Sequence, residues 1–216
     1  MNLAINSVAA LILAAGDDVP RQPPPGIGEN TLIICADGGG QLARRWGLQP
    51  QIIIGDLDSL GEGDQNYWRN RGVSFKTAPA RKDQTDVELA VDYALNRGAA
   101  RITLIGGWGS RIDHSLGNVE LLYRLALLGV ENQLLTSTHV LSAFCGSVRR
   151  RVRPGSLVSL VPLTPVVRGV ATEGLGYPLK GHDLHKGSTF SISNYAVRGE
   201  VSVEIAQGVL LIVCQA

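Results

Sequence analysis

The first two-thirds of the chain alternates short apolar runs with helical patterns, and this alternation constrains the fold more than any other feature. The apolar runs that predict strands are 8–14, 31–35, 51–55, 102–107 and 132–136. Near-continuous apolar strands separated by helices favour a parallel sheet that is covered on both faces. In such sheets, ligands bind beyond the carboxyl ends of the strands.

Two helices are predicted in some detail. Over 85–98, Thr85 and Glu88 form a capping-box pattern, and Gly98 suits the position that follows the last turn. A second helix is expected after His114. Its predicted inner stripe consists of Leu116, Val119, Leu122, Leu125 and Ala126.

The pattern changes near residue 140, after which no convincing helix occurs. Short β runs separated by turn residues stand at 140–144, 156–162, 189–193, 200–206 and 209–214. The last two runs predict a hairpin with Gln207 and Gly208 at its turn. We therefore expect a Rossmann-like parallel-sheet α/β domain over residues 1–140, followed by a small antiparallel β-sandwich domain over residues 141–216.

Composition excludes several classes of protein. A net charge of +1 and 18% charged residues provide no overall field for nucleic acid or an anionic membrane. Cys35, Cys145 and Cys214 are far apart and odd in number, so we expect buried thiols of a reducing compartment. The apolar N-terminal run has no Lys or Arg before it, which favours a first buried strand over a signal peptide. These observations predict a soluble cytoplasmic protein.

Four short acidic segments follow or cap the apolar runs. They are ADGGG (36–40), GDLDS (55–59), KDQTD (82–86) and GSRIDH (109–114). Gathering carboxylates costs free energy unless a cation neutralises them. The segments therefore predict a Mg²⁺ and phosphate site at the edge of the sheet.

The first two segments offer carboxylates and glycines. On an extended backbone, Asp56 and Asp58 would face the same side and point at one metal ion, whereas the alternative is an Asx-turn. Asp37 ends a predicted strand, and the glycines that follow enter a predicted helix over 38–46. Their backbone N–H groups suit a phosphate, and the alternative is a glycine turn with Asp37 as helix cap. Neither a Walker loop nor a GxGxxG fingerprint is present.

The last two segments add cations and polar groups. Asp86 lies in the first turn of the helix over 85–98, and Lys82 and Gln84 stand beside it. Arg111 can hold phosphate oxygens in a fork, while Asp113 can either fix Arg111 or act as a base. A phosphate contact and a helix cap are both open for His114.

Together these segments resemble the thiamine pyrophosphokinase family. The matching stretches are ADGGG, GDLDS, KDQTDVELA, GGWGSRIDHSLGN, GLGYPLKG (174–181) and SISN (191–194), in the family's order over nearly the whole chain. Two departures are Ser110, where the family often has glycine, and Tyr195, where glutamate is common.

The resemblance implies a Mg²⁺-dependent homodimer that transfers pyrophosphate from ATP to the hydroxyl of thiamine, giving thiamine diphosphate and AMP. The thiamine pocket would lie between the α/β domain of one subunit and the β domain of its partner. By the same resemblance, Asp56, Asp58 and Asp86 gather Mg²⁺, and Asp37 or Asp58 orients or deprotonates the hydroxyl. The residues expected to hold phosphates and ribose are Gln84, Arg111, Asp113 and His114, and those expected to bind the aminopyrimidine are Ser193 and Asn194.

Three other functions fit the same acidic segments. One is a diphosphokinase for another heteroaromatic alcohol, such as a hydroxymethylpterin. The second is a nucleotide- or thiamine-binding protein without catalysis, and the third is a Mg²⁺-dependent phosphohydrolase. Release of AMP that requires thiamine distinguishes a thiamine pyrophosphokinase from all three alternatives.

Overall fold

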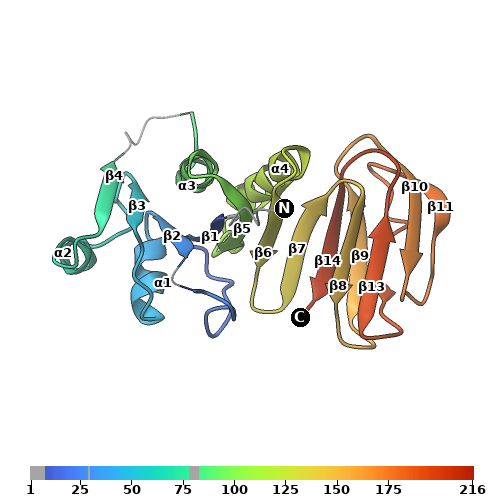
Figure 1. Cartoon of the computed structure of the whole chain (residues 1–216), viewed down its shortest axis with the longest axis horizontal. Helices are drawn as coiled ribbons and strands as arrows, with labels where there is room; N and C mark the ends of the chain where they lie inside the picture. The colour runs from blue at the N-terminus through green and yellow to red at the C-terminus, as the bar shows by residue number, and fades with distance from the viewer. Residues whose placement is uncertain (1–7, 29, 78–82) are drawn as a thin grey trace, which may run out of the picture. The chain divides into compact units, whose positions relative to one another are not determined.

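The computed structural model describes residues 8–28, 30–77 and 83–216, and the chain divides into two compact units. Unit 1 covers residues 1–118 and unit 2 covers residues 119–216 (Figure 1). The predicted domain boundary after residue 140 falls inside a strand of unit 2, His139–Phe144, and it stays a prediction. Lys82 lies outside the described residues.

Unit 1 is built on five parallel strands in the order β5-β1-β2-β3-β4. The strands are β1 (Val8–Leu13), β2 (Thr31–Ala36), β3 (Ile52–Gly55), β4 (Ser74–Thr77) and β5 (Ala99–Ile105). The helices are α1 (Gly39–Arg45), α2 (Glu62–Arg69), α3 (Asp86–Asn96) and α4 (Ile112–Leu127), the last of which continues into unit 2. Figure 1 shows α1 and α3 on opposite sides of the row of strands. This arrangement confirms the predicted α/β domain with a covered parallel sheet.

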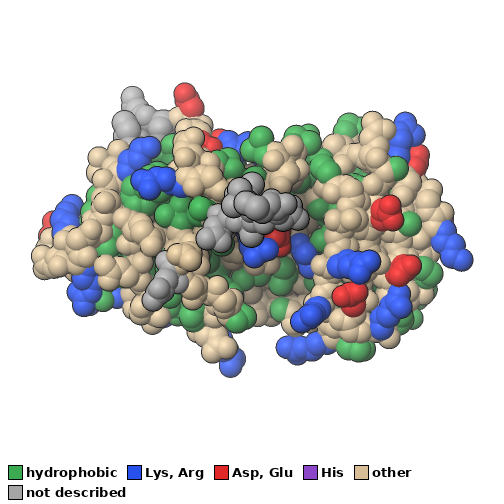
Figure 2. Space-filling model, viewed as in Figure 1, with side chains coloured by type: hydrophobic (Ala, Val, Ile, Leu, Met, Phe, Trp, Pro, Cys, Tyr) green, Lys and Arg blue, Asp and Glu red, His purple; other side chains and the backbone are tan. Residues whose placement is uncertain are grey.

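Unit 2 is an antiparallel sandwich of two sheets, which also confirms the prediction. One sheet has the order β6-β7-β14-β9-β12, with β6 (Glu131–Leu135), β7 (His139–Phe144), β14 (Leu210–Gln215), β9 (Leu157–Pro162) and β12 (Asn194–Tyr195). The other has the order β8-β13-β10-β11, with β8 (Ser147–Arg151), β13 (Glu200–Glu204), β10 (Val166–Glu173) and β11 (Lys180–His185). Buried side chains from both sheets, such as Leu160, Ile212 and Val203, form one core. Figure 2 shows acidic and basic side chains interspersed over the visible face of this unit.

The predicted hairpin at the C-terminus is wrong, because its two strands belong to different sheets. β13 pairs with β8 and β10, whereas β14 pairs with β7 and β9. Gln207 instead forms an isolated bridge with Arg168, and Gly208 has a φ of +102°. A Gln-Gly turn signal marks a change of direction, but it does not tell a hairpin from a link between sheets.

The predicted strand at 189–193 is absent, and the segment forms turns. The Ile192 N–H donates to the Thr189 carbonyl at 3.3 Å, and Ser193 has a φ of +61°. This left-handed backbone ends any extended run, although the Thr-Phe-Ser-Ile composition favours a strand. Edge strand β4 and helix α2 were not predicted, since neither carries a clear apolar pattern.

Two burial predictions are also wrong. Leu116 is 59% exposed, because buried Ser115 and Asn118 turn the polar side of α4 inward to bind the loop before it. Cys145 is exposed in the turn after β7, whereas Cys35 and Cys214 are buried as predicted, and all three thiols are free. Among the described residues, no helix has both the length and the apolar character needed to span a membrane.

Close packing explains the glycines at the start of α1. A Cβ built on Gly39 would lie 2.0 Å from the Leu13 carbonyl oxygen, so this glycine lets the helix approach β1. Gly38 is the N-cap residue and no side chain caps the helix, so Asp37 is not its cap. Gly39 therefore serves the close contact between α1 and β1.

We expect Gly39→Ala to lower the free energy of unfolding by about 2 kcal/mol or more, because backbone atoms must shift to admit the methyl group. The control is Gly63→Ala in α2, where an added Cβ meets no atom within 4 Å. This change should be neutral or raise stability by about 0.5 kcal/mol through helix propensity. Urea unfolding measures both variants, and equal stability of the two would contradict the packing argument.

Candidate functional site

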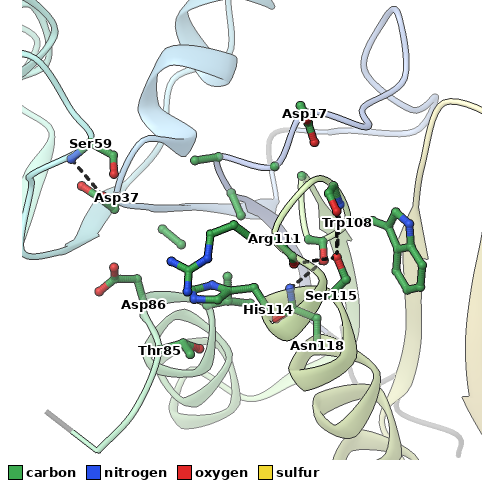
Figure 3. A pocket seen from close by; sticks show the side chains of 18 of the residues that line it. Asp17, Asp37, Ser59, Thr85, Asp86, Trp108, Arg111, His114, Ser115 and Asn118 are labelled. Carbon is green, nitrogen blue, oxygen red and sulfur yellow. Dashed lines mark hydrogen bonds between the residues drawn. The ribbon is translucent and has the colours of Figure 1, made fainter.

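A cavity of about 560 Å³ lies at the carboxyl ends of the strands of unit 1. The segments after β1, β2, β3 and β5 meet there with the beginnings of α3 and α4 (Figure 3). This convergence confirms that the acidic segments share one edge of the sheet. The lining side chains from these segments include Asp17, Asp37, Asp56, Asp58, Ser59, Gln84, Asp86, Trp108, Ser110, Arg111, His114, Ser115 and Asn118.

Three carboxylates gather in this cavity. Each of Asp37, Asp56 and Asp86 offers an oxygen, and these oxygens lie within 4.8 Å of one another. Gly55 makes the approach possible, because a Cβ there would lie 2.9 Å from the Asp37 Cβ and 3.2 Å from the Asp86 Cγ. Such a group of hard oxygen ligands suits a divalent cation such as Mg²⁺.

Asp37 is the buried member of the group. Its side chain is 8% exposed, its φ is +44°, and its Oδ2 accepts a hydrogen bond of 3.2 Å from the Ser59 N–H. Within the described part of the chain, the buried Oδ1 atom has no hydrogen-bond partner. A buried carboxylate oxygen without a partner is costly, and a bound cation would satisfy it. The residues therefore fit a divalent metal ion.

Asp58 lines the same cavity but does not belong to the group of three. Leu57 has a φ of +68°, so the backbone between Asp56 and Asp58 is not extended and the predicted geometry is wrong. Instead, the Asp58 N–H donates to Asp56 Oδ1 at 3.2 Å, which is the alternative Asx-turn. Metal ligation by Asp58 stays a prediction.

Helix α3 begins with the predicted cap. Thr85 Oγ1 accepts a 3.1 Å hydrogen bond from the Glu88 N–H, which places Asp86 in the first turn. Gln84, also in the cavity lining, donates from Nε2 to Asp92 Oδ2 at 2.9 Å. The helix terminus thus fixes one carboxylate of the group and one neutral amide beside it.

Arg111 and Asp113 form a two-point ion pair at the start of α4. Arg111 Nη2 lies 2.6 Å from Asp113 Oδ2, and Nε lies 3.3 Å from Oδ1. The hydrogen bond from Arg111 lowers the pKa of Asp113, and the same bond raises the pKa of Arg111. The geometry therefore favours Asp113 as the residue that orients Arg111 over a role as base, since a lowered pKa weakens a base.

His114 lies beside this pair. Its Nε2 is 3.9 Å from Asp113 Oδ2, and its side chain lines the cavity with that of Arg111. Figure 3 shows both side chains on the same side as Asp86. Two cationic or polar groups therefore line the same cavity as the three carboxylates, as a site for a metal-bound anion requires.

The glycine loop at 106–111 is held by residues that the sequence did not single out. Buried Asn118 donates to the Gly107 carbonyl at 2.7 Å, and Ser115 Oγ accepts from the Gly109 N–H at 3.2 Å. On the other side, Asp17 Oδ1 accepts from the Ser110 N–H at 2.9 Å. Ser115 and Asn118 belong to the stretch GGWGSRIDHSLGN, which resembles the family, so the sequence could have identified them. Asp17 belongs to none of the motifs.

Ser193 and Asn194 lie in unit 2 and are described there. Asn194 Oδ1 accepts from the Tyr177 N–H at 3.1 Å, and Asn194 Nδ2 donates to the Tyr177 carbonyl at 2.8 Å. These two bonds join the GLGYPLKG and SISN stretches. The exposed Tyr177 ring meets Tyr195 edge to face, with centroids 5.6 Å apart. The Ser193 N–H donates to Ser159 Oγ at 3.0 Å.

Two family models and several curated proteins match this chain. Residues 27–134 match the model for the catalytic domain of thiamin pyrophosphokinase, and residues 147–210 match its vitamin B1 binding domain. A thiamine pyrophosphokinase of Bacillus subtilis is 28% identical over 187 residues, which cover 86% of this chain and 87% of the relative. Thiamine pyrophosphokinase 1 of Arabidopsis thaliana is 26% identical, over 89% of this chain and 81% of the relative.

Solved structures match the fold over nearly the full length. The crystal structure of the thiamine pyrophosphokinase from Bacillus subtilis has a TM-score of 0.88 at 24% identity, and the match covers 97% of this chain and 99% of that one. The thiamin pyrophosphokinase from Geobacillus thermodenitrificans gives a TM-score of 0.84 at 26% identity, over 97% of both chains. The acidic site, the two matched domains and the shared fold lead to one conclusion: this chain belongs to the thiamine pyrophosphokinase family.

Proposed function

We propose that this chain is a thiamine pyrophosphokinase, which transfers pyrophosphate from ATP to the hydroxyl of thiamine and releases AMP. The observation that carries the proposal is the convergence of Asp37, Asp56 and Asp86 in one cavity that Arg111 also lines. Phosphoryl-transfer reactions depend on positioning and on neutralising charge, and this cavity supplies groups for both.

The three carboxylates would hold Mg²⁺, with Asp58 as a further ligand or as the group that receives the hydroxyl proton. When bound, the cation neutralises charge on the polyphosphate. The buried Asp37 oxygen without a partner supports its place in this group. Asp56 and Asp86 were expected as ligands from the sequence, and the proximity of the Asp37 carboxylate supports it as a third.

Arg111 and His114 would bind the phosphates, and Gln84 would bind a polar group of the nucleotide. Asp113 pairs with the Arg111 guanidinium through two hydrogen bonds, which would favour one direction of this side chain for an anion. In the reaction, the thiamine oxygen forms a bond to the β-phosphorus while the bond to the AMP oxygen breaks. Arg111 would counter the charge that develops during this exchange.

Ser193 and Asn194 would hydrogen-bond the aminopyrimidine of thiamine, as the family resemblance implies. The Asn194 amide is already paired with the Tyr177 backbone, so its first role is to shape the segment that presents the tyrosine. The exposed faces of Tyr177 and Tyr195 suit a cationic thiazolium ring. The matched vitamin B1 binding domain supports this assignment.

We also propose a homodimer in the cytoplasm. Unit 2 exposes several large apolar side chains close in sequence to the proposed thiamine residues: Tyr177, Phe190, Ile192, Tyr195 and Val197. Exposed apolar groups of this size are typical of interaction surfaces. The three free thiols fit a reducing compartment.

The other readings are less well supported. If the chain were a diphosphokinase for another heteroaromatic alcohol, the match to a vitamin B1 binding domain would be unexplained. A phosphohydrolase or a binding protein without catalysis would leave the relatives' shared activity unexplained.

The direct test is thiamine-dependent conversion of ATP to AMP, with and without Mg²⁺. We expect AMP only when thiamine and the cation are both present. Asp58→Asn should lower turnover about 100-fold or more with little change in melting temperature. AMP release without thiamine, or near wild-type turnover of the variant, would contradict the assignment.

Asp37→Asn tests the metal group through stability. Without a cation the three carboxylates repel one another, so the neutral side chain should raise the melting temperature in a chelator by about 2–4 °C. In Mg²⁺ the wild type should gain stability by ligand binding, and the variant should gain much less. Thermal unfolding in chelator and in Mg²⁺ measures both effects, and a variant that keeps the full Mg²⁺ gain would rule Asp37 out as a ligand.

Sedimentation equilibrium tests the oligomeric state. We expect a species of twice the 23.0 kDa chain mass, and Ile192→Asp should shift it toward the monomer because the change places a charge in an apolar contact. Leu128→Asp, at an exposed position after α4, is the matched control and should remain dimeric. A monomeric wild type would refute the dimer.

A further inference from the structure

Asp17 is a charged residue at the edge of the cavity to which the family comparison gives no role. It precedes residues 27–134, the stretch that matches the catalytic-domain model. Its exposed side chain lines the cavity after β1. A carboxylate at a phosphate site is unfavourable unless it contributes something else, so its contacts decide its role.

The segment that contains Asp17 runs alongside the glycine loop. The Gly16 N–H donates to the Gly106 carbonyl at 2.8 Å, and the Asp18 N–H donates to the Trp108 carbonyl at 3.3 Å. Between them, Asp17 Oδ1 accepts from the Ser110 N–H at 2.9 Å. The side chain therefore extends this backbone ladder to the residue that directly precedes Arg111.

The carboxylate and the loop also fit each other by shape. A Cβ built on Gly109 would lie 2.0 Å from Asp17 Oδ1, so the glycine leaves the space that the carboxylate fills. The hydrogen bond from the Ser110 N–H lowers the pKa of Asp17, because this bond favours the ionised carboxylate. A hydrogen bond to an ionised acceptor is stronger than a neutral one.

Asp17 and Ser115 hold the turn from opposite sides. Ser115 Oγ accepts from the Gly109 N–H and donates to the Arg111 carbonyl at 3.1 Å, while Asp17 accepts from Ser110. Three consecutive residues are thus fixed where the loop enters α4. His114 follows three residues after Arg111, and the direction of both side chains depends on this turn.

We propose that Asp17 is a positioning residue for nucleotide binding, which fixes the Gly109–Ser110 turn so that Arg111 and His114 face the phosphates. The inference rests on the proposed function, since it assigns the cavity to a nucleotide. Ser110, which stands where the family often has glycine, still supplies the backbone N–H that Asp17 binds. The carboxylate acts through the loop and does not contact the substrate.

Calorimetry with Mg²⁺ and a non-hydrolysable ATP analogue tests the proposal without any turnover. Asp17→Ala should weaken binding about five-fold, as expected for the loss of one hydrogen bond. Asp17→Asn keeps an oxygen at the same place and should restore most of the affinity. Glu62→Ala removes an exposed carboxylate of the same unit that does not line the cavity, and it should bind the analogue as the wild type does.

Hydrogen exchange separates this proposal from the proposed function. In Asp17→Ala, the Ser110 amide should exchange faster while the melting temperature stays within about 1 °C, because an exposed side chain contributes little to global stability. Unchanged exchange and unchanged affinity would overturn the positioning role and leave the function intact. Tighter binding by Asp17→Ala would also overturn it, since the carboxylate would then compete with phosphate. A wild type that binds no analogue would overturn both.

Discussion

Mutual repulsion among Asp37, Asp56 and Asp86 is the constraint on which the rest of the site depends. Three carboxylates with oxygens within 4.8 Å of one another repel each other. They stay this close only if the fold holds them there or a cation neutralises them. The fold does force them together. Gly55 has no side chain that would occupy the space beside Asp37 and Asp86, and Asp37 adopts a left-handed backbone in a buried position. The hydrogen bond that Ser59 donates to Asp37 satisfies one oxygen and leaves the other for a ligand.

The remaining parts of unit 1 bring cationic and polar side chains to the cavity that contains this acidic group. The parallel sheet brings the ends of β1, β2, β3 and β5 to one edge, and α3 and α4 begin there. The loop before α4 is held by Ser115, Asn118 and Asp17, so Arg111 enters the cavity from a fixed turn. In the proposed function, the three carboxylates would hold the cation, and Arg111, paired with Asp113, would bind phosphate oxygens. Such a site would not need a Walker loop.

Much of the fold could be predicted from the sequence, because the spacing of apolar residues and the capping residues indicate strands and helices directly. The apolar runs predicted every strand of unit 1 except the edge strand β4, and Thr85 predicted the start of α3. The failures share a cause, which is tertiary context. Gln207–Gly208 links two sheets where its composition favours a hairpin, and Leu116 is exposed because Ser115 and Asn118 set the phase of α4. No local signal carries this information.

In the site, too, local sequence predicted some features, and tertiary contacts determined the others. The sequence identified Asp37, Asp56, Asp86 and Arg111, since each follows a strand or begins a helix. It placed Asp56 and Asp58 together by assuming an extended backbone, whereas Leu57 is left-handed and Asp37 completes the group of three. Asp17 could not be found at all, because its partner Ser110 is 93 residues away in the chain.

The convergence of the three carboxylates on one cation can be measured directly by crystallography with Mn²⁺, which replaces Mg²⁺ at oxygen sites and scatters X-rays anomalously. The account predicts an anomalous difference peak within about 2.0–2.4 Å of oxygens from Asp37, Asp56 and Asp86. A peak bound to other residues, or no peak at a Mn²⁺ concentration that supports turnover, would contradict it.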